Sequence, residues 1–331
     1  MLDADNLFLQ NTDELFQCGH FCAVFINPCI FHTGLFVLQP SSKVFKTMLH
    51  DLDMKRSSLD SADQGFIGGY FPDLLDQPMF HPPPNSTKRL HGTFRLPLGY
   101  QMDVSYFYLK LRWSIPCGPN SVITFPGAPW LKPWYWWSWP FLPLGIQWHE
   151  QRRQTLGYDS EMSIVLVQTL FYLGIIGITR LGPSSLTNLC YRTTDKNTRI
   201  IRGIMMASIL ISYLLPFFII PRTIHPIMGW SIYLVGSFAM SNIAITVFLL
   251  PMVVVLTPWM GIIGGLLVMA CPWYNDGVVR ALFVFAYALC VAPILWLSLG
   301  KIGSSRHIPL EKEGFFTDST TQPDHCFNKL Y

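Results

Sequence analysis

The chain has 331 residues, half of them apolar, and charged residues make up only 13% of it. Soluble proteins carry about 25% charged residues, so this composition favours a membrane protein. The formal net charge of +3 is too small to indicate nucleic-acid binding, and no Lys/Arg-rich block is interleaved with aromatic residues. The composition therefore predicts a membrane protein that does not bind nucleic acid.

The hydrophobicity is unevenly distributed along the chain. Residues 1–161 carry mixed charge, Pro-rich loops and short β-like runs, whereas long uncharged apolar stretches begin at Met162. A shift of this kind indicates two regions of different physical character. We divide the chain into a folded domain, a juxtamembrane linker, a membrane domain and a polar tail, at residues 1–150, 151–162, 163–300 and 301–331.

The first motif is MLDADN, in which Asp3 and Asp5 flank Ala4. At a strand end, alternate side chains share a face, so the two carboxylates can converge on one ion. Oxygen ligands suit Mg²⁺ or Mn²⁺, which commonly hold substrate phosphates through one or two carboxylates. The alternative is a polar turn with no chemical role.

The cysteines of the first region leave two alternatives open. Cys18 and Cys22 are four residues apart, but no CxxC or HxxxH pair follows to complete a zinc site. We expect disulfides if this region faces an oxidising lumen, and small buried thiols otherwise. Asn85 begins the triplet Asn-Ser-Thr, an N-glycosylation acceptor that favours the lumen.

A second polar motif is LDSADQG at residues 59–65. Asp60, Asp63 and Gln64 offer two carboxylates and an amide, which are groups that bind sugar hydroxyls specifically. The same stretch also has the pattern of a helix start, with Asp60 as the cap and Asp63 in the third helical position. Both interpretations can hold together.

The second region predicts five membrane spans. No Asp, Glu, Lys, Arg or His occurs from Pro226 to Asn275, and these 50 residues exceed the roughly 20 that one span needs. They make two spans with a break near Pro251, and the total becomes six if this run divides differently. The spans have no ionisable residue in their interior, which favours an anchor over a transporter. Their approximate bounds are 163–180, 203–221, 227–249, 251–271 and 281–300.

The charges of the connections predict the orientation. Cytoplasmic segments are enriched in Lys and Arg, so the connection after the first span and the tail are placed in the cytosol. Residues 1–161 then face the lumen, and we expect a multi-pass Golgi membrane protein. The basic residues concerned are Arg180, Arg192, Lys196, Arg199, Arg202, Lys301, Arg306 and Lys312.

Four motifs in this order resemble glycosyltransferase family 8, the glycogenin-like retaining transferases. They are the DxD, FHTGLFVLQPS at 31–41, LDSADQG, and TFPGAPWLKPWYWW at 124–137. The chain is similar to the plant branch of glycogenin-like starch initiation proteins, whose glucuronosyltransferase subgroup has C-terminal membrane spans. The resemblance covers about residues 1–150 and implies an α/β fold of the GT-A type, which binds a nucleotide sugar at the carboxyl ends of its strands.

The resemblance also implies roles for individual residues. Asp3 and Asp5 would hold a divalent ion, Mn²⁺, against the two phosphates of a UDP-sugar. Lys132 would add a cation on the diphosphate, and Gly127 would allow close backbone approach. Asp60, Asp63 and Gln64 would be the catalytic residues beside the transferred sugar. The implied nucleotide-sugar-binding residues are Asp3, Ala4, Asp5, His32, Gly127 and Lys132.

The chain departs from the family pattern at several positions. Thr124 stands where the family has a histidine as third metal ligand, and two extra residues precede KPW. His32 replaces the asparagine of the family's NSG-like turn, where it could meet the sugar, the metal or only its local surroundings. The Trp-rich run 130–139 could stack on sugars or settle at the membrane interface, and its closeness to the first span favours the interface.

These inferences predict a retaining, metal-dependent hexosyltransferase. It would move a hexose or hexuronic acid from a UDP-sugar to a glycan or glycolipid acceptor. The alternative is a truncated or degenerate homologue that acts as a membrane-anchored scaffold. In the family, the segments that bind uracil and ribose precede the DxD, so a chain starting at Met1 is expected to lack about a third of the domain and to bind nucleotide sugars poorly.

Overall fold

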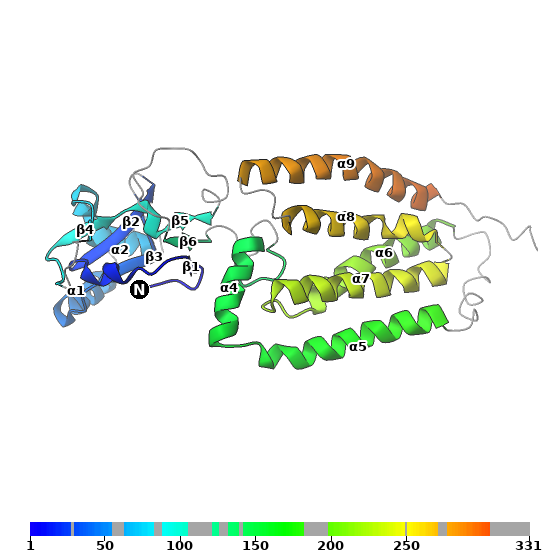
Figure 1. The fold of residues 1–331 in the computed structure, drawn as a ribbon, viewed down its shortest axis with the longest axis horizontal. Coiled ribbons are helices and arrows are strands. Elements are labelled where there is room, and N and C mark those ends of the chain that lie inside the picture. The colour runs from blue at the N-terminus through cyan, green and yellow to red at the C-terminus, as the bar shows by residue number, and fades with distance from the viewer. Residues whose placement is uncertain are drawn as a thin grey trace, which may run out of the picture.

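The computed structural model describes residues 1–27, 30–54, 63–82, 88–104, 121–125, 132–138, 142–181, 198–248, 250–270 and 277–304. Figure 1 shows the strands at one end of the molecule and the long helices at the other, with α4 (Leu142–Thr155) between them. The described residues therefore include a region of strands with short helices and a region of long helices.

The first sheet is built around β2 (Phe21–Asn27). Strand β3 (Ile30–Leu38) pairs with it antiparallel on one side, and β4 (Thr93–Leu96) pairs with it parallel on the other. Side chains alternate along β2, as the pleat requires. Phe21 and Ala23 belong to one buried cluster, and Cys22 and Val24 belong to another. The sheet is thus apolar on both faces.

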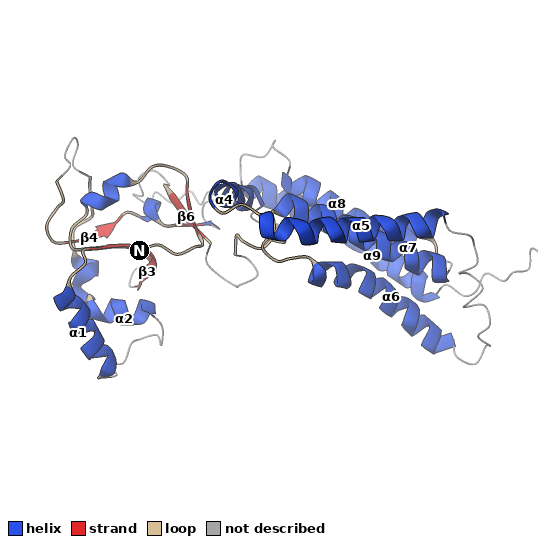
Figure 2. Cartoon of the chain, turned by 90° about the horizontal axis from the view of Figure 1, so that it is seen from below, coloured by secondary structure: helices blue, strands red, loops and turns tan. Residues whose placement is uncertain are grey.

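Short helices surround this sheet. Figure 2 shows α1 and α2 on the same side of it, and Ile67 of α2 packs against the cluster that contains Phe21 and Phe36. Helix α1 begins after Ser41, whose Oγ accepts a hydrogen bond from the Val44 N–H and so caps the first turn. The helices and helical turns are α1 (Ser42–Asp53), α2 (Asp63–Tyr70), η1 (Asp13–Gln17), η2 (Pro72–Asp76) and η3 (Leu98–Tyr100).

The second sheet is smaller and has the strand order β1-β6-β5. It contains β1 (Asn6–Phe8), β5 (Met102–Asp103) and β6 (Val122–Thr124), with β1 antiparallel and β5 parallel to β6. Leu7, Ile123 and Leu144 of α4 share its buried core. The described strands therefore form two three-stranded sheets.

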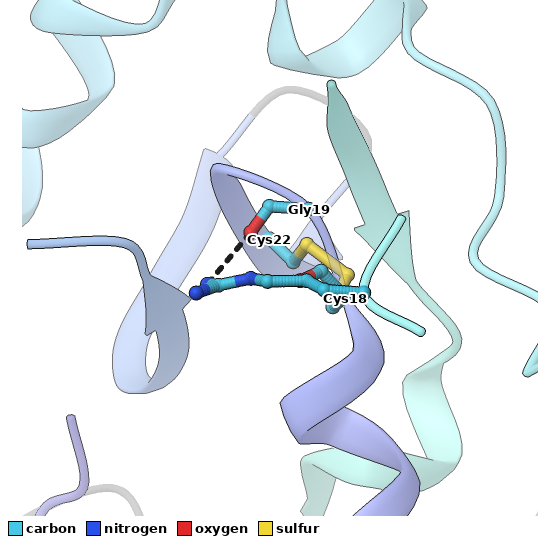
Figure 3. Close-up of a disulfide and its surroundings, with 4 residues drawn as sticks. Cys18, Gly19 and Cys22 are labelled. Atoms are coloured by element: carbon cyan, nitrogen blue, oxygen red, sulfur yellow. Dashed lines mark hydrogen bonds between the residues drawn. A yellow bond between two sulfur atoms is a disulfide. The ribbon is translucent and has the colours of Figure 1, made fainter. Parts of the chain in front are cut away.

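A disulfide between Cys18 and Cys22 decides the alternative that the sequence left open. It joins the end of η1 to β2, and Figure 3 shows it beside Gly19. Arg89 donates from Nε to the Cys18 carbonyl at 2.8 Å and from Nη2 to the Gly19 carbonyl at 2.9 Å. The bridge and the arginine together hold the loop that leads into the central strand.

The helical region consists of long helices that run alongside one another (Figures 1 and 2). Four described helical segments are long and apolar enough to cross a membrane: 159–181, 226–248, 252–270 and 282–301. The apolar segment 203–219 is shorter. The helices are α5 (Asp159–Leu181), α6 (Thr198–Ile219), α7 (Pro226–Phe248), α8 (Met252–Ala270) and α9 (Gly277–Ser304).

The outer surface of this bundle suits lipid better than water. Leu289 is 74% exposed and Trp296 is 78% exposed on α9. Contiguous exposed apolar side chains of this kind mark a surface that contacts membrane or protein. The C-terminal ends of α5 and α9, which carry Arg180 and Lys301, lie at the end of the bundle away from the sheets (Figure 1).

A buried histidine lies where α4 meets the first long helix. His149 is fully buried, its Nδ1 contacts the Tyr158 hydroxyl, and its ring packs edge-on against His225 at a centroid distance of 5.7 Å. Burial, with the nearby His225 and Arg152, lowers the pKa of His149 to about 3. The neutral ring is therefore the form that the fold accommodates.

We expect the protein to lose stability as the pH falls below about 6.5. Below that pH the unfolded chain binds a proton on His149 and the folded chain does not. The free energy of unfolding is therefore expected to be about 2 kcal/mol lower at pH 5 than at neutral pH. Thermal unfolding in nanodiscs at pH 7 and pH 5 measures this, with His149→Phe losing most of the difference. His81→Phe, which changes an exposed histidine, is the control, and an unchanged pH dependence in His149→Phe would contradict the assignment.

Candidate functional site

The two aspartates of the DxD lie at the junction between the two sheets. Leu2 forms an isolated antiparallel bridge with Leu35 of β3, and Asn6 opens β1, which pairs with β6. Ala4 and Asp5 form a turn between these two pairings. The carboxylates therefore precede a strand, where a strand end had been expected. The motif therefore forms a turn, as in the alternative interpretation of a polar turn, and this turn is attached to both sheets.

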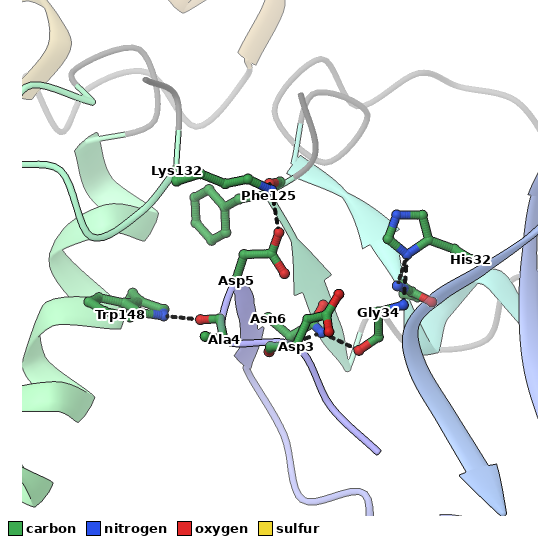
Figure 4. A network of polar contacts seen from close by, with 10 residues as sticks. Asp3, Ala4, Asp5, Asn6, His32, Gly34, Phe125, Lys132 and Trp148 are labelled. Carbon is green, nitrogen blue, oxygen red and sulfur yellow. Dashed lines mark hydrogen bonds and ion pairs between the residues drawn. The ribbon is translucent and has the colours of Figure 1, made fainter. Parts of the chain in front are cut away.

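Asn6 and Gly34 fix this turn in place. The Asp3 N–H donates to the Gly34 carbonyl at 2.9 Å, and Asn6 Nδ2 donates to the same carbonyl at 2.7 Å. On the other side, Trp148 Nε1 of α4 donates to the Ala4 carbonyl at 2.9 Å. Figure 4 shows the turn held between these groups. Its backbone is thus positioned by three separate elements.

Asp5 is buried and paired with Lys132. The Lys132 Nζ lies 2.5 Å from Asp5 Oδ2 and donates to the Phe125 carbonyl at 2.8 Å (Figure 4). Asp5 is only 8% exposed, and its Oδ1 has no hydrogen-bond partner among the residues that the structure describes. Because a buried carboxylate oxygen is costly to leave unpaired, this atom is suited to a further cationic or donor ligand.

Asp3 lies near other acidic groups and is more exposed. Partial burial and the charge of Asp5 raise the pKa of Asp3, and the charge of Asp63 raises it further. His32 and Lys132 act in the opposite direction. Asp63 opens α2, so the structure brings one residue of the LDSADQG motif within electrostatic reach of the DxD. A cation bound here would relieve the repulsion among these carboxylates.

His32 on β3 has one ring nitrogen fully engaged. Its Nδ1 accepts a hydrogen bond from the Gly34 N–H at 3.0 Å and lies 2.6 Å from Gln101 Nε2. A backbone N–H can only donate, so Nδ1 carries no proton and the neutral ring carries its proton on Nε2. Burial lowers the pKa of His32, which favours this neutral form. His32 therefore presents a donor, which suits a hydroxyl or phosphate oxygen better than a metal ion.

Several predicted site residues lie outside the described part of the chain, and Thr124 lies inside it. The residues outside it are Asp60, Asn85 and Gly127. Thr124 is fully buried in β6 opposite Asn6, and its Oγ1 has no partner among the described residues. It occupies the neighbourhood in which the resemblance implies a third ligand, with a hydroxyl in place of an imidazole.

Asn6, Gln101 and Trp148 are positioning residues that the sequence did not identify as part of the site. Asn6 directly follows the DxD, so its place in the motif was a usable signal. Gln101 is fully buried against His32. Trp148 lies 144 positions from Ala4 along the chain, and nothing in its local pattern indicates the contact.

Replacing Gly34 with alanine is expected to disrupt the His32–Gln101 pair. A Cβ at this position would lie 2.3 Å from Gln101 Nε2 and 2.8 Å from His32 Nδ1. Forcing a methyl group into so tight a site costs about 1–3 kcal/mol. Thermal unfolding measures the loss, and Gly69→Ala in α2, where a Cβ meets nothing within 4 Å, is the matched control. Equal melting temperatures for the two variants would show that the pair is not packed as described.

The donor set fits a divalent ion that is shared with a substrate. Among the described residues, no group of three or more His, Cys, Asp or Glu side chains could enclose a metal. Asp3 and the free oxygen of Asp5 supply two carboxylate ligands. Mg²⁺ and Mn²⁺ sites that act on phosphates are commonly built in this way, with one or two carboxylates and the rest from phosphate and water. The residues thus fit such an ion only together with a phosphate ligand.

Comparisons with known proteins show which proteins the chain is similar to. The family description "PGSIP7 C-terminal domain" matches residues 160–315. "Putative glucuronosyltransferase PGSIP7" of Arabidopsis thaliana is 65% identical over 320 residues, covering 96% of this chain and 65% of the relative. "Putative glucuronosyltransferase PGSIP8" of the same plant is 65% identical over 338 residues, covering 100% of this chain and 67% of the relative. The chain thus spans about two thirds of the length of these relatives.

Two further relatives match a part of the chain at lower coverage. "Inositol phosphorylceramide glucuronosyltransferase 1" of Arabidopsis thaliana is 30% identical over 189 residues, which is 54% of this chain and 35% of the relative. Glycogenin-2 of Homo sapiens is 44% identical over 136 residues, which is 40% of this chain and 24% of the relative. The chain belongs to the glycogenin-related family of glycosyltransferases that includes the Arabidopsis PGSIP7 and PGSIP8 proteins.

Proposed function

We propose that this chain is the membrane-bound part of a glycosyltransferase that moves a hexose or hexuronic acid from a UDP-sugar to a glycan or glycolipid. The reaction is proposed to retain the anomeric configuration and to depend on Mn²⁺ or a similar divalent ion. The observation that carries this proposal is the buried Asp5–Lys132 pair beside Asp3. It places carboxylates for a cation and a cation for a phosphate within one small site.

The chemistry of this site suits the departure of a nucleoside diphosphate. A bound divalent ion would act as a Lewis acid that neutralises charge on the leaving phosphates. Asp3 and Asp5 hold the ion, and Lys132 donates hydrogen bonds to phosphate oxygens from a site that is largely shielded from water. Fixed charges of this kind stabilise a transition state strongly because they need no reorganisation.

The groups next to the carboxylates suit recognition of the sugar. His32 offers an Nε2–H donor, and Asp63 and Gln64 at the start of α2 offer a carboxylate and an amide. We propose that these three bind hydroxyls of the transferred sugar, with Asp60 contributing from the preceding segment. The mixed sheets and their flanking helices are proposed to form part of a GT-A domain.

We further propose that the α/β region faces the Golgi lumen and the C-terminal tail faces the cytosol. The disulfide between Cys18 and Cys22 supports this, because such bonds persist in oxidising compartments. The glycosylation acceptor at Asn85 supports it as well, and so do Arg180 and Lys301 at the end of the bundle away from the sheets. A lumenal site suits an acceptor glycan or glycolipid that reaches the membrane surface.

The second candidate function is a non-catalytic scaffold. The observation that favours it is Thr124, which stands at the position of the family's histidine ligand. If the Thr124 hydroxyl does not ligate the ion, the site has one protein ligand fewer than the family pattern implies, and the ion would be bound more weakly.

A transfer assay separates the two candidates. The full-length protein in nanodiscs is supplied with UDP-glucuronic acid or UDP-glucose, with and without Mn²⁺, and release of UDP is measured. The enzyme proposal expects Mn²⁺-dependent UDP release that Asp5→Asn abolishes. Release of no UDP from either donor, together with equal UDP binding by wild type and Asp5→Asn, would favour the scaffold.

A further inference from the structure

The turn that carries Lys132 also reaches the membrane helices. Within residues 132–138, the Ser138 hydroxyl donates to the Lys132 carbonyl at 2.7 Å and the Tyr135 N–H donates to it at 3.2 Å. Two hydrogen bonds on one carbonyl make this a closed turn. Trp136 lies inside this turn, so we expect a displacement of Trp136 to move Lys132 as well.

Trp136 is inserted between two of the long helices. It is fully buried, and its backbone N–H donates to the Arg222 carbonyl at 3.2 Å in the connection between α6 and α7. Its ring lies 5.3 Å from that of Phe217 on α6 and 5.1 Å from that of Trp230 on α7. The sequence had favoured an interfacial role for this aromatic run, and the structure adds that one of its rings is enclosed by protein.

Gly229 of α7 lies directly against the Trp136 side chain. A Cβ at this position would lie 2.5 Å from Trp136 Cγ and 2.6 Å from its Cβ. Glycine lowers the stability of a helix interior, so its presence in the first turn of α7 has a local cost. That cost is explained by the close approach of the indole, which no other residue at this position would permit.

The connection between α6 and α7 also contacts α4, the helix that holds the turn with Asp3 and Asp5. Arg152 of α4 donates to the Thr223 carbonyl, one residue from Arg222, and to Glu161 of α5 at 2.8 Å. One turn earlier on α4, Trp148 holds the Ala4 carbonyl. The turn that carries Asp3 and Asp5 and the turn that carries Lys132 are therefore both connected to residues 222–223, at the end of the membrane helices.

We propose that the α6–α7 end of the membrane domain is a structural wall of the candidate active site, with Trp136 and Gly229 as positioning residues that hold Lys132 against Asp5. The membrane domain then does more than anchor the α/β region. Only the effect of this positioning on sugar transfer rests on the function proposed above. The placement of Lys132 can be tested without any turnover.

The first test measures the reactivity of the Lys132 amine. The full-length protein in nanodiscs is treated with a limiting amine-reactive ester, and modification of Lys132 is followed by peptide mass spectrometry. The Lys132 side chain is only 20% exposed and its Nζ is held against Asp5 Oδ2 at 2.5 Å, so loss of this placement is expected to expose the amine and raise its labelling severalfold. Gly229→Ala is expected to show this rise. Gly174→Ala on α5, where a Cβ meets nothing within 4 Å, is the matched control and is expected to label as wild type.

A second variant covers the case in which Gly229→Ala does not fold. Trp136→Phe shortens the ring without crowding the helix, and it is also expected to raise Lys132 labelling. Wild-type labelling in a folded Gly229→Ala or Trp136→Phe variant would overturn the proposal. If the wild type releases no UDP, the proposed function fails, whereas the labelling result still decides the placement of Lys132.

The link to transfer is tested by a double-mutant cycle. If Gly229 acts through Lys132, Gly229→Ala is expected to lower kcat/KM about tenfold in the wild type and to change it little in Lys132→Met. Residues coupled through shared partners show this non-additivity, whereas distant independent sites do not. Equal losses in both backgrounds would show a general structural effect and would contradict a positioning role.

Discussion

Asp5→Asn is expected to lower kcat/KM for sugar transfer by at least about 100-fold in the full-length protein. Loss of a group that orients a metal or its ligands typically costs 10–100-fold, and Asp5 is itself a proposed ligand. Asparagine keeps the shape and one acceptor oxygen but removes the charge that faces Lys132 at 2.5 Å. Steady-state kinetics with the UDP-sugar varied at fixed Mn²⁺ measures the loss.

Two comparisons make this result specific. Asp76→Asn removes an exposed carboxylate from η2 and is expected to leave kcat/KM unchanged. Raising the Mn²⁺ concentration is expected to recover part of the activity of Asp5→Asn, because the defect lies in ion binding. Wild-type kinetics in Asp5→Asn would show that the DxD is the inert polar turn considered at the outset.

Lys132→Met is expected to have the second largest effect, with a loss of about 100-fold in kcat/KM. Methionine retains much of the length and apolar stem of lysine, so the change removes mainly the charge and its hydrogen bonds. Electrostatic groups aimed at a developing charge are worth about 10²–10³-fold in rate. The variant also leaves Asp5 buried without its partner, which is expected to destabilise the fold by about 1–3 kcal/mol.

The controls for this variant follow from the geometry. Lys43→Met on the exposed face of α1 is expected to match the wild type. Lys132→Arg is expected to be intermediate, because a guanidinium carries the charge but is larger and planar. A Lys132→Met enzyme with unchanged kcat and KM would remove the diphosphate role assigned to this residue.

The pairing of Asp5 with Lys132 shows what motifs can and cannot predict. Each residue was identified from its own motif, although 127 positions separate them. Their contact depends on the register of β1 with β6, in which Asn6 lies opposite Thr124. Short strands of three residues carry too little hydrophobic pattern to predict that register from sequence. The family resemblance placed Asp5 and Lys132 in one site, but the geometry of their contact came only from the structure.

His32 shows the same limit at the scale of one ring. The sequence left sugar, metal and local contacts open as its partners. The choice among these depends on which nitrogen is occupied, and the Gly34 N–H occupies Nδ1. A hydrogen bond two residues along the chain is invisible in composition and spacing. The Cys18–Cys22 disulfide was likewise left open, because spacing alone does not determine pairing.

The long helices followed more directly from the sequence. Each of the five expected apolar segments falls largely on one helix, and α7 and α8 are separated at Pro251. Only four described helical segments are long enough to cross a membrane, because the apolar segment 203–219 of α6 is shorter than expected. Uncharged runs of this length have few alternatives, because backbone groups in a bilayer must be satisfied within the segment. The insertion of Trp136 beside Gly229 was not predictable, because it depends on packing between helices and a distant turn.

The most direct test of the central claim is the binding of Mn²⁺ in the presence of UDP. Free Mn²⁺ gives a strong electron paramagnetic resonance signal that diminishes when the ion is bound, so a titration of the full-length protein reports the bound fraction. We expect UDP to promote Mn²⁺ binding beyond the level of UDP alone in the wild type, and Asp3→Asn and Asp5→Asn to abolish that gain. An equal gain in the wild type and in both variants would contradict a metal–diphosphate site at the DxD.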